Sequence, residues 1–536
     1  MSDTTPAPPT TFNMADVWEA IADRVADREA LVCDGETRTY AELEANANRI
    51  AHALAAEGVG AGDHVGVYLG NCPAYLETML GAWKLRAVPI NVNYRYVADE
   101  LRYLLDDARV KVLVHAVETT DRVAEVASRV ESLRETWSVG LGGTLAAVMA
   151  AGSPGRDFGP RSNDDHYVIY TGGTTGMPKG VVWRQEDAFF ACIGGGDPMR
   201  MSGPVERPEE LVDRIIDFDF TAYPLAPLIH AAAQWTSLSW FFCGARVVLH
   251  GGSFDARAVW ETIAKENVST MIMVGDAMAR PLADAWDEFG PFEVPSLFAI
   301  GSGGAPLSPY LKERFREMLP NTVLTDGFGS SETGAQGSQR IEPGATSGKG
   351  GTRFDRMGPG TTVLADDRTE VQPGSGVVGR VALTGRVPLG YLHDPLKTAD
   401  TFVEVDGRRW VITGDAATVA EDGSINLLGR GSVSINTGGE KVFPEEVEAA
   451  LKSHPSVYDA VVVGVPDERW GERVVAVVEP VEGETPTLDD LAAHCRASIA
   501  GYKVPRDLVL VAQVVRSPVG KADYPWAKRT ALDAPG

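Results

Sequence analysis

The chain has few cysteines, no long apolar run and no recognisable leader. Five cysteines are spread over 536 residues without a CxxC pair, which argues against a disulfide scaffold and against a zinc site. No stretch approaches 18 apolar residues, so we expect no transmembrane segment. The first residues lack the basic start and apolar core of a signal peptide. These absences predict a cytoplasmic location.

Basic residues are outnumbered: 49 Lys and Arg stand against 74 Asp and Glu, a formal charge of −25. Clustered cations are what grips nucleic acid or anionic lipid, so we expect neither partner. Anionic small ligands are not excluded, because backbone N–H groups and local cations bind phosphate on acidic proteins too. A hydrophobic content of 44% and 23% charged residues are ordinary for a globular chain, which excludes an intrinsically disordered protein.

Several catalytic signatures are also missing. The chain has no GxxxxGK[ST] loop, no GxSxG elbow and no HExxH motif, which disfavours P-loop nucleotide hydrolysis, serine hydrolysis and zinc peptidase chemistry. The segment from Gly301 to Pro306 begins like a GxGxxG fingerprint but ends in proline. A dinucleotide-binding fold is therefore disfavoured as well.

Apolar patterns alternate between helix and strand from residue 41 to residue 319, which predicts a mostly parallel α/β sheet for this part of the chain. The expected helices are 41–56, 77–85, 256–266 and 309–319, and the expected strands are 65–69, 110–114, 167–170, 247–249, 270–274 and 297–300. The long segment 194–220 carries a short helical pattern and suggests a functional excursion.

The texture changes after about residue 340, where glycine becomes frequent and a short strand is expected at 377–383. A Gly-, Ser- and Asn-rich stretch at 423–439 suits a hinge. Beyond it we expect helices at 444–451 and 488–499 and strands at 460–465 and 474–478. We predict a large N-terminal α/β domain of packed mixed sheets and helices, residues 1–430, and a smaller mobile α+β domain, residues 431–536.

The strongest local signal is the segment from Tyr170 to Gly180, YTGGTTGMPKG, which follows an apolar strand. Its glycines allow close approach of the backbone to a ligand. Its hydroxyl groups and the ammonium of Lys179 suit a polyphosphate. A flexible surface turn is the plain alternative, but turns rarely combine glycines, threonines and a lysine behind a buried strand.

This loop resembles the phosphate-binding signature of the adenylate-forming superfamily, which includes acyl-CoA synthetases, peptide-synthetase adenylation domains and luciferases. Further segments resemble the other signatures of that superfamily in the same order along the chain. They are Pro227–His230, Gly303–Pro306, Asp326–Glu332, Trp410–Asp415, the stretch opening at Gly429–Arg430, and Pro518–Lys521. Together they span most of the chain.

The resemblance implies ATP, Mg²⁺ and coenzyme A as ligands and assigns roles to individual residues. The residues implied in catalysis are Lys521, Lys179, Glu332, Thr174 and His230, with Glu332 and Thr174 also holding the metal. The nucleotide- and coenzyme-binding residues implied are Thr171, Gly172, Gly173, Thr175, Gly176, Gly303, Gly304, Ala305, Pro306, Asp326, Gly327, Phe328, Gly329, Ser331, Asp415, Arg430, Gly438, Gly439 and Lys441. Turn, helix-start and surface roles are the alternatives for single members.

The resemblance further implies two half-reactions with rotation of the small domain between them. Only fifteen residues follow Lys521, so we expect free coenzyme A, and no fused carrier, as the acceptor. Val433 stands where Asp or Lys is common in the hinge, and it lacks their charge. We therefore expect Gly431, Ser432 or Ser434 to act as the pivot. A homodimer is compatible with the pattern.

Longer strings, among them GGTTGMPKGVVWRQED and GRGSVSINTGGEKVFPEEVE, resemble actinobacterial acyl-CoA ligases for steroid side-chain acids or long fatty acids. The substrate expected is a small-molecule carboxylic acid, large and apolar, foremost a steroid side-chain carboxylate. Fatty acids are the second choice. The expected pocket residues are Ile229, His230, Trp235, Val274, Gly275, Asp276 and Gly301–Gly304. A phosphotransferase and a non-catalytic acyl- or nucleotide-binding module remain as alternatives from other classes.

Overall fold

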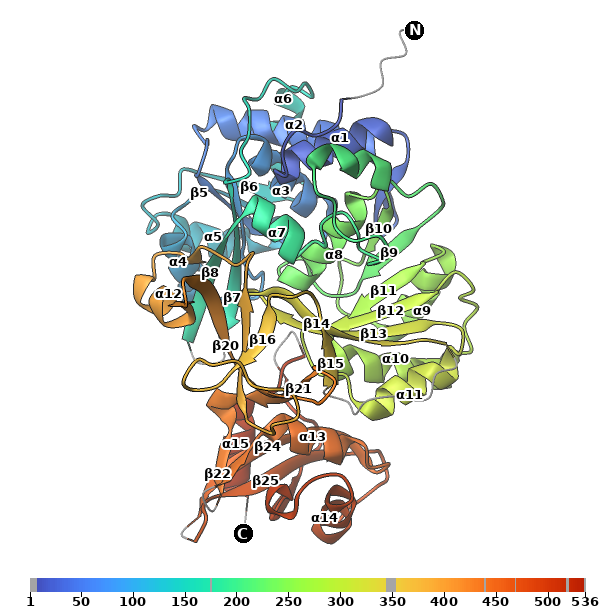
Figure 1. Ribbon diagram of the computed structural model, residues 1–536. Helices are drawn as coiled ribbons and strands as arrows, with labels where there is room; N and C mark the ends of the chain where they lie inside the picture. Colours follow the sequence, from blue (N-terminus) through green and yellow to red (C-terminus); the bar gives the residue numbers. More distant parts are fainter. Residues whose placement is uncertain are drawn as a thin grey trace.

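The computed structural model describes residues 7–173, 176–343, 353–437, 440–467, 469–516 and 520–534, apart from the side chains of residues 172, 173, 176 and 432. A large body contains the N-terminal and central parts of the chain, and a small domain carries the C-terminal part beneath it (Figure 1). Within these ranges, no helix is both long and apolar enough to cross a membrane.

The N-terminal part holds a parallel sheet in the order β4-β3-β5-β6. Its strands are β3 (His64–Tyr68), β4 (Val88–Asn91), β5 (Val110–Ala116) and β6 (Glu135–Val139). The helices before and between them are α1 (Met14–Arg24), α2 (Tyr40–Ala56), α3 (Pro73–Lys84), α4 (Ala98–Asp107) and α5 (Thr120–Ala127), with the 3₁₀ turn η1 (Val117–Thr119), and α6 (Leu145–Ala151) follows β6. Thr39 and Glu42 begin α2 with a capping box, a reciprocal pairing that satisfies two free N–H groups.

The largest sheet of the described residues runs in the order β16-β17-β20-β21-β15-β14-β13-β12-β11-β9-β10-β1-β2, with β19 beside β20. The half of this sheet from β13 to β2 in that order comprises β1 (Glu29–Cys33), β2 (Glu36–Thr39), β9 (Thr221–Pro224), β10 (Arg246–Leu249), β11 (Thr270–Met273), β12 (Ala299–Gly303) and β13 (Val323–Ser330). Apart from β2, neighbours in this half run parallel. The helices connecting them are α8 (Ala231–Phe241), α9 (Ala256–Lys265), α10 (Gly275–Phe289) and α11 (Pro309–Met318), with η2 (Pro208–Arg214) before β9.

The other half of this sheet is antiparallel. Its strands are β14 (Gly334–Ile341), β15 (Arg353–Arg356), β16 (Thr361–Leu364), β17 (Gly379–Thr384), β19 (Phe402–Val405), β20 (Arg408–Val419) and β21 (Ile425–Arg430). The parallel arrangement expected from the alternating helices and strands is confirmed for β1 and for β9 to β13 of this sheet, and the antiparallel half begins at β14. Short connections replace the crossover helices there, and only antiparallel strands can be joined so closely.

A third sheet places the glycine-rich segment, in the order β18-β8-β7. It consists of β7 (His166–Gly173), β8 (Gly176–Arg184) and β18 (Gly390–Tyr391), flanked by α7 (Gln185–Ala191) and α12 (Pro395–Thr401). The segment read as a loop after a strand is thus an antiparallel hairpin. Residues 174 and 175 at its tip lie outside the described residues.

The small domain has a five-stranded sheet among its described residues, in the order β23-β22-β25-β24 with β26 beside β25. Its elements are η3 (Gly431–Val433), β22 (Ile435–Thr437), β23 (Glu440–Val442), α13 (Pro444–Lys452), β24 (Val457–Asp467), β25 (Gly471–Pro480), α14 (Leu488–Arg496), η4 (Gly501–Lys503), β26 (Asp507–Leu510) and α15 (Tyr524–Asp533). The last strand of the large sheet ends at Arg430, directly before η3.

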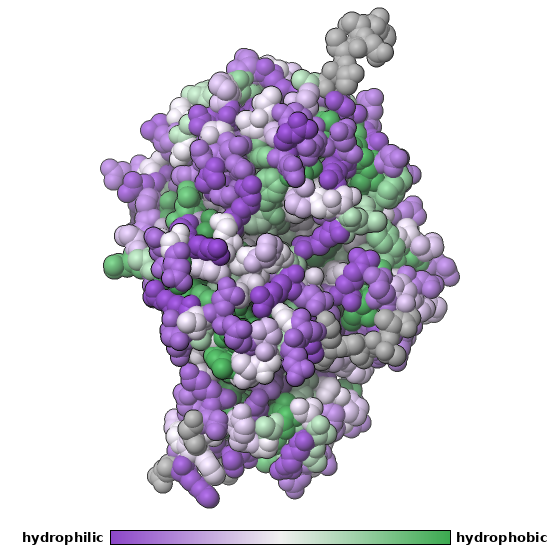
Figure 2. All heavy atoms as spheres, in the orientation of Figure 1, coloured by the Kyte–Doolittle hydropathy of each residue, from purple (hydrophilic) through white to green (hydrophobic). Residues whose placement is uncertain are grey.

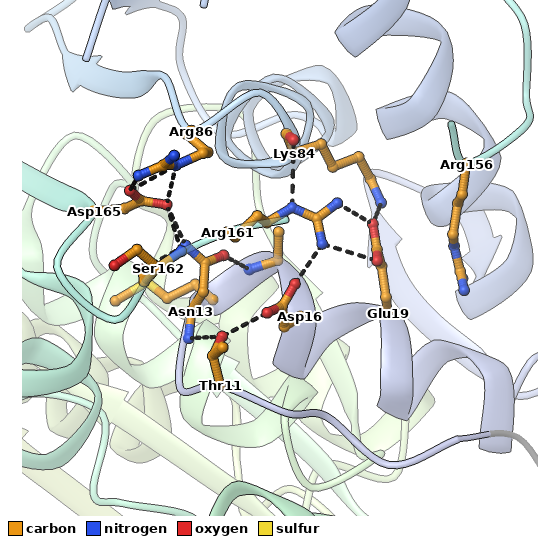
Figure 3. Close-up of polar contacts among 12 residues, drawn as sticks. Thr11, Asn13, Asp16, Glu19, Lys84, Arg86, Arg156, Arg161, Ser162 and Asp165 are labelled. Atoms are coloured by element: carbon orange, nitrogen blue, oxygen red, sulfur yellow. Dashed lines mark hydrogen bonds and ion pairs between the residues drawn. The ribbon is translucent and has the colours of Figure 1, made fainter. Parts of the chain in front are cut away.

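A network of ion pairs holds the segment that leads into β7 against the N-terminal helices (Figure 3). Arg161 lies between Asp16 and Glu19 of α1, with Nη2 2.7 Å from Glu19 Oε1. Lys84, at the end of α3 and with a fully buried side chain, contacts Glu19 and also Glu44 at 2.6 and 2.8 Å. These contacts anchor the base of the glycine-rich hairpin in the core of the large body.

Hydrophilic and hydrophobic side chains are intermixed over the face that shows both domains (Figure 2). Exposed large apolar residues such as Met201 and Leu396 are ordinary when scattered singly.

Candidate functional site

Lys179 lies on β8, directly opposite Thr171 of β7. Its ammonium pairs with the carboxylate of Asp394, whose other oxygen accepts a hydrogen bond from Lys397 N at 2.8 Å and caps α12. Lys179 foremost, together with this backbone contact, holds the pKa of Asp394 below its ordinary value. The expected Thr174 and Thr175 lie outside the described residues, as do the side-chain positions of Gly172, Gly173 and Gly176.

Tyr391 joins this lysine to Glu332. The Tyr391 hydroxyl donates to Glu332 Oε1 at 2.9 Å, and the Lys179 ammonium lies 6.0 Å from the centre of the Tyr391 ring. Burial and the neighbouring Glu332 raise the pKa of Tyr391, so the hydroxyl keeps its proton and remains a donor. The sequence reasoning missed Tyr391 and Asp394. An Asp-Pro helix start was visible at residue 394, but its contact with residue 179 was not.

Glu332 is also the expected metal ligand. In the described part of the chain, no three His, Cys, Asp or Glu side chains are grouped to hold a metal ion. A single carboxylate beside the glycine-rich hairpin nevertheless fits Mg²⁺, which binds proteins through one or two carboxylates plus substrate phosphates.

The segment from Gly303 to Pro306 leaves the end of β12 and crosses the start of α10. Gly304 has a φ of +82°, which glycine adopts without strain. The Pro306 carbonyl accepts a hydrogen bond from Asp276 N at 3.0 Å. A side chain at Gly275 would come within 2.4 Å of the Pro306 oxygen, so this close crossing requires glycine.

The next expected segment lies on β13. Its first carboxylate, that of Asp326, pairs with a helix and is not grouped with the carboxylates of Glu332 and Asp415. Asp326 is 3% exposed and pairs with Lys312 of α11 at 2.7 Å. Burial raises the pKa of Asp326 to about 6 although Lys312 opposes the rise. Asp326 thus ties β13, and with it Gly327 and Gly329, to α11.

Further along β13, Phe328 makes an edge contact with Phe354, with ring centroids 5.1 Å apart. The carbonyl of Ser331 accepts a hydrogen bond from Trp183 Nε1 at 2.9 Å. These contacts hold the strand end that leads to Glu332 against both β15 and the glycine-rich hairpin.

Asp415 and Arg430 face each other across the pair β20–β21. Arg430 Nε lies 3.6 Å from Asp415 Oδ1, and the Arg430 backbone N–H donates to Glu445 of α13 at 3.2 Å. Burial, with Glu448 nearby, raises the pKa of Glu445 to about 7. The last strand of the large body is therefore in contact with the first helix of the small domain.

Lys521 brings the small domain to this group. The residue as a whole is exposed, but surrounding protein removes water from its ammonium and, with Arg430, lowers its pKa. Glu332 and Asp415 act in the opposite direction. Lys521 is therefore within electrostatic reach of Glu332, which precedes β14, and of the facing pair on β20 and β21.

His230 directly precedes α8. Burial, with Lys521 and Arg95 adding positive charge, lowers the pKa of His230 to about 4. Among the described residues its Nε2 is buried without a hydrogen-bond partner. A neutral imidazole with an unsatisfied nitrogen suits a polar ligand atom, because buried polar groups are normally paired.

An apolar cavity of about 100 Å³ lies beside the helix that follows His230, between α8 and the ends of β11 and β12. Its lining is Pro224, Ala226, Ala232, Ala233, Ile272, Met273, Val274, Gly301, Ser302 and Gly303. Val274 and the glycine run are as expected. Asp276 is a correction to the expected pocket, because its carboxylate accepts from Ser308 N at 2.7 Å and pairs with Lys452 of the small domain.

Of the three expected coenzyme-binding residues, the structure describes only Lys441. Gly438 and Gly439 lie outside the described residues, and Lys441 is exposed on β23 of the small domain. No interaction within the described ranges joins Lys441 to the large body.

Comparison with known proteins gives the family. The AMP-binding enzyme family matches residues 18–392, and the AMP-binding enzyme C-terminal domain matches residues 446–521. The chain belongs to the AMP-binding enzyme family. This confirms the resemblance to adenylate-forming enzymes.

The relatives narrow the class. A 3-oxocholest-4-en-26-oate–CoA ligase of Rhodococcus rhodochrous is 46% identical, over 96% of this chain and 95% of the relative. A medium/long-chain-fatty-acid–CoA/3-oxocholest-4-en-26-oate–CoA ligase of Mycolicibacterium smegmatis is 46% identical, over 98% and 97%. These matches confirm the expected kind of enzyme, an ATP-dependent, AMP-forming acid–thiol ligase.

The fold is confirmed by solved structures. The crystal structure of the anthranilate CoA ligase AuaEII in complex with anthranoyl-AMP superposes with a TM-score of 0.82 at 23% identity, covering 98% of each chain. The large mixed α/β body with a smaller C-terminal domain is the arrangement expected from the sequence.

Proposed function

We propose that this chain joins a large apolar carboxylic acid to coenzyme A, with ATP as the energy source. A carboxylate oxygen bonds to the α-phosphorus of ATP and pyrophosphate leaves. The coenzyme thiol then bonds to the acyl carbon and AMP leaves. The observation that carries the proposal is the grouping of Lys179, Tyr391 and Glu332 in the large body, in a chain that matches the AMP-binding enzyme family.

The two lysines offset charge in the first half-reaction. The attacking carboxylate and the triphosphate are both anions, so Lys179 and Lys521 lower the energy of bringing them together. Mg²⁺, when bound, neutralises phosphate charge, with Glu332 and Thr174 as its proposed protein ligands. Tyr391 orients Glu332 through its hydroxyl.

The nucleotide roles follow the same logic. Asp415 accepts hydrogen bonds from two ribose hydroxyls, and Arg430 donates to the same sugar. The backbone of Gly303–Pro306 and the end of β13 line the adenine site, with Phe328 contributing ring surface. For Asp326 we propose a supporting role through Lys312.

The neutral imidazole of His230 contacts the acyl carboxylate. Its low pKa means that it adds no third positive charge at pH 7, so it acts as a hydrogen-bonding group beside Lys521. The unsatisfied Nε2 supports this role.

For the second half-reaction we propose that residues 431–536 rotate as a domain relative to residues 1–430, about the segment containing Gly431 and Ser434. The rotation brings Gly438, Gly439 and Lys441 to the thiol path, where glycine permits close packing. A cytoplasmic location and a homodimer remain predictions.

The acyl group that we propose is a steroid side-chain carboxylate, supported by the names of the relatives. Ligand pockets for molecules of this size reach several hundred Å³, and the apolar cavity measures about 100 Å³. Binding of a steroid acid therefore requires the pocket to widen. A medium- or long-chain fatty acid is the second candidate, supported by the name of the Mycolicibacterium smegmatis relative.

The test is AMP release with ATP, Mg²⁺ and coenzyme A, in parallel with a cholestenoate, a C16 fatty acid and benzoate. We expect turnover with the first and weaker turnover with the second. Turnover of the fatty acid alone rejects the steroid proposal. No AMP with any acid rejects the ligase itself in favour of a binding module, and release of ADP indicates a phosphotransferase.

A further inference from the structure

One face of α10 is turned to the small domain. Asp276, Arg280 and Asp284 follow each other at intervals of four residues, so they share a helix face. The Tyr458 hydroxyl of β24 donates to Asp284 Oδ2 at 3.0 Å. The Arg280 guanidinium lies 5.0 Å from the centre of the Tyr458 ring. This face is therefore the docking surface of the small domain on the large body.

Asp276 and Lys452 form a buried ion pair across this boundary. Lys452 Nζ, at the end of α13, lies 2.8 Å from Asp276 Oδ2, and the two side chains are 6% (Lys452) and 8% (Asp276) exposed. Asp276 Oδ1 is at the same time held by Ser308 N at 2.7 Å. A buried charge that loses its partner is strongly unfavourable. The pair therefore fixes where α13 sits on α10.

The same turn of α10 supports the loop that carries Lys521. A side chain at Gly520 would lie 2.5 Å from Ala277 Cβ, next to Asp276. Arg516 donates from Nη1 to the Gly520 carbonyl at 3.1 Å and is itself held by Asp459 at 2.6 Å. The Gly520 backbone is thus clamped between Arg516 and the first turn of α10, one residue before Lys521.

We propose that Asp276 and Lys452 are positioning residues for acyl-adenylate formation, which hold the small domain so that Lys521 reaches its substrate. The inference rests on the proposed function. Neither residue contacts the reacting groups. Rotation of the small domain for thioester formation separates the two side chains, so the pair contributes to the first half-reaction and not to the second.

The test compares the two half-reactions in Lys452→Met, which keeps the length of the side chain and removes its charge. Adenylation is followed by pyrophosphate release without coenzyme A, and thioester formation by adding coenzyme A to supplied acyl-adenylate. We expect the adenylation kcat to fall about tenfold or more, with KM for ATP within about twofold. Thioester formation stays within about twofold of wild type.

Asp276→Asn is the second variant. It is needed because Lys452 also faces Glu448, so that removing the Lys452 charge can unfold the small domain by itself. The asparagine side chain keeps an acceptor for Ser308 N, so we expect the same split between half-reactions. Lys452→Arg restores most of the adenylation rate. Lys503→Met is the matched control: Lys503 pairs with Glu446 at 2.7 Å within the small domain, and its loss leaves the ratio of the half-reactions unchanged.

The outcomes separate the two proposals. If wild type releases no AMP with any acid, the proposed function fails. If wild type is active and both Lys452→Met and Asp276→Asn adenylate normally, the positioning role alone is overturned. Equal loss of both half-reactions with a lowered thermal midpoint likewise overturns it, because that pattern marks a purely structural ion pair.

Discussion

The two lysines that we propose for one site, Lys179 and Lys521, are held by the molecule in different ways. Lys179 sits in a hairpin whose strands are neighbours in the sequence, inside the large body, and its ammonium meets Asp394 of the same body. Lys521 follows Gly520 in the small domain and depends on α10 of the large body for its place. The position of Lys179 is set within the large body, whereas the position of Lys521 depends on the contact between the two domains.

The difference separates two properties of the site. A hairpin anchored in the core keeps its cation in place throughout the cycle, which suits a group that holds phosphates. A docked cation is present only while the domains are in contact, which suits a group needed in one half-reaction. Changes near Lys521 should therefore divide the half-reactions, and changes near Lys179 should alter nucleotide binding.

The largest effect is expected for Lys521→Ala. Loss of a cation aimed at developing charge lowers the rate of acyl-adenylate formation about 100- to 1000-fold. Thioester formation from supplied acyl-adenylate is retained, because the small domain then presents another face. Both rates are measured separately, with Lys528→Ala of α15 as the control. Equal loss of both half-reactions contradicts the docked role of Lys521.

Gly520→Ala tests the docking without touching the charge. Gly520 has a φ of +72°, and an added Cβ would meet Ala277 at 2.5 Å, so we expect adenylation to fall about tenfold, from backbone strain plus displacement of the loop. Gly483→Ala is matched to it, since Gly483 has a φ of +84° with nothing within 4 Å. Equal adenylation rates in the two variants would mean that strain alone matters.

The pKa of His230, a residue of the large body, depends on the positive charge of Lys521 nearby. In the folded protein it is about 4 against an ordinary value of 6.5, so between these pH values the unfolded chain binds more protons. Stability therefore falls as pH drops from 6.5 toward 4. We expect thermal midpoints of His230→Asn to decline less over this window than those of wild type. An NMR titration should show a higher His230 pKa in Lys521→Ala; an unchanged value contradicts the electrostatic contact.

The smallest effect is expected for a change beside Lys179, the lysine whose position is set within the large body. Asp394 competes with phosphate for Lys179, so Asp394→Asn, which can still cap α12, should lower KM for ATP about two- to fivefold. Steady-state kinetics with varied ATP measures it. Asp400→Asn removes a surface partner of Lys397 and should leave KM unchanged. A rise of KM in Asp394→Asn would show that Asp394 positions Lys179 for ATP.

Most elements could be predicted from apolar patterns, and the exceptions have physical reasons. The strand expected at 297–300 is β12 at Ala299–Gly303, because Gly301 and Gly303 carry no side chain to signal a strand and are placed by pairing with β11 and β13. The helix expected at 77–85 begins earlier, at Pro73. The apolar pattern does not reveal this start, because residues 74–84 are buried on all sides and show no amphipathic face.

The motifs, through their resemblance to those of the adenylate-forming superfamily, predicted the class of enzyme that the family matches confirm, and they predicted a phosphate segment, a metal carboxylate, a ribose-binding pair and a C-terminal lysine. Their residue types carry that information wherever the chain folds. Only the tertiary structure decided what holds them, from Tyr391 on Glu332 to Lys452 on Asp276. Those partners are tens to hundreds of residues apart, and their pairing arises from burial at surfaces that local sequence does not describe.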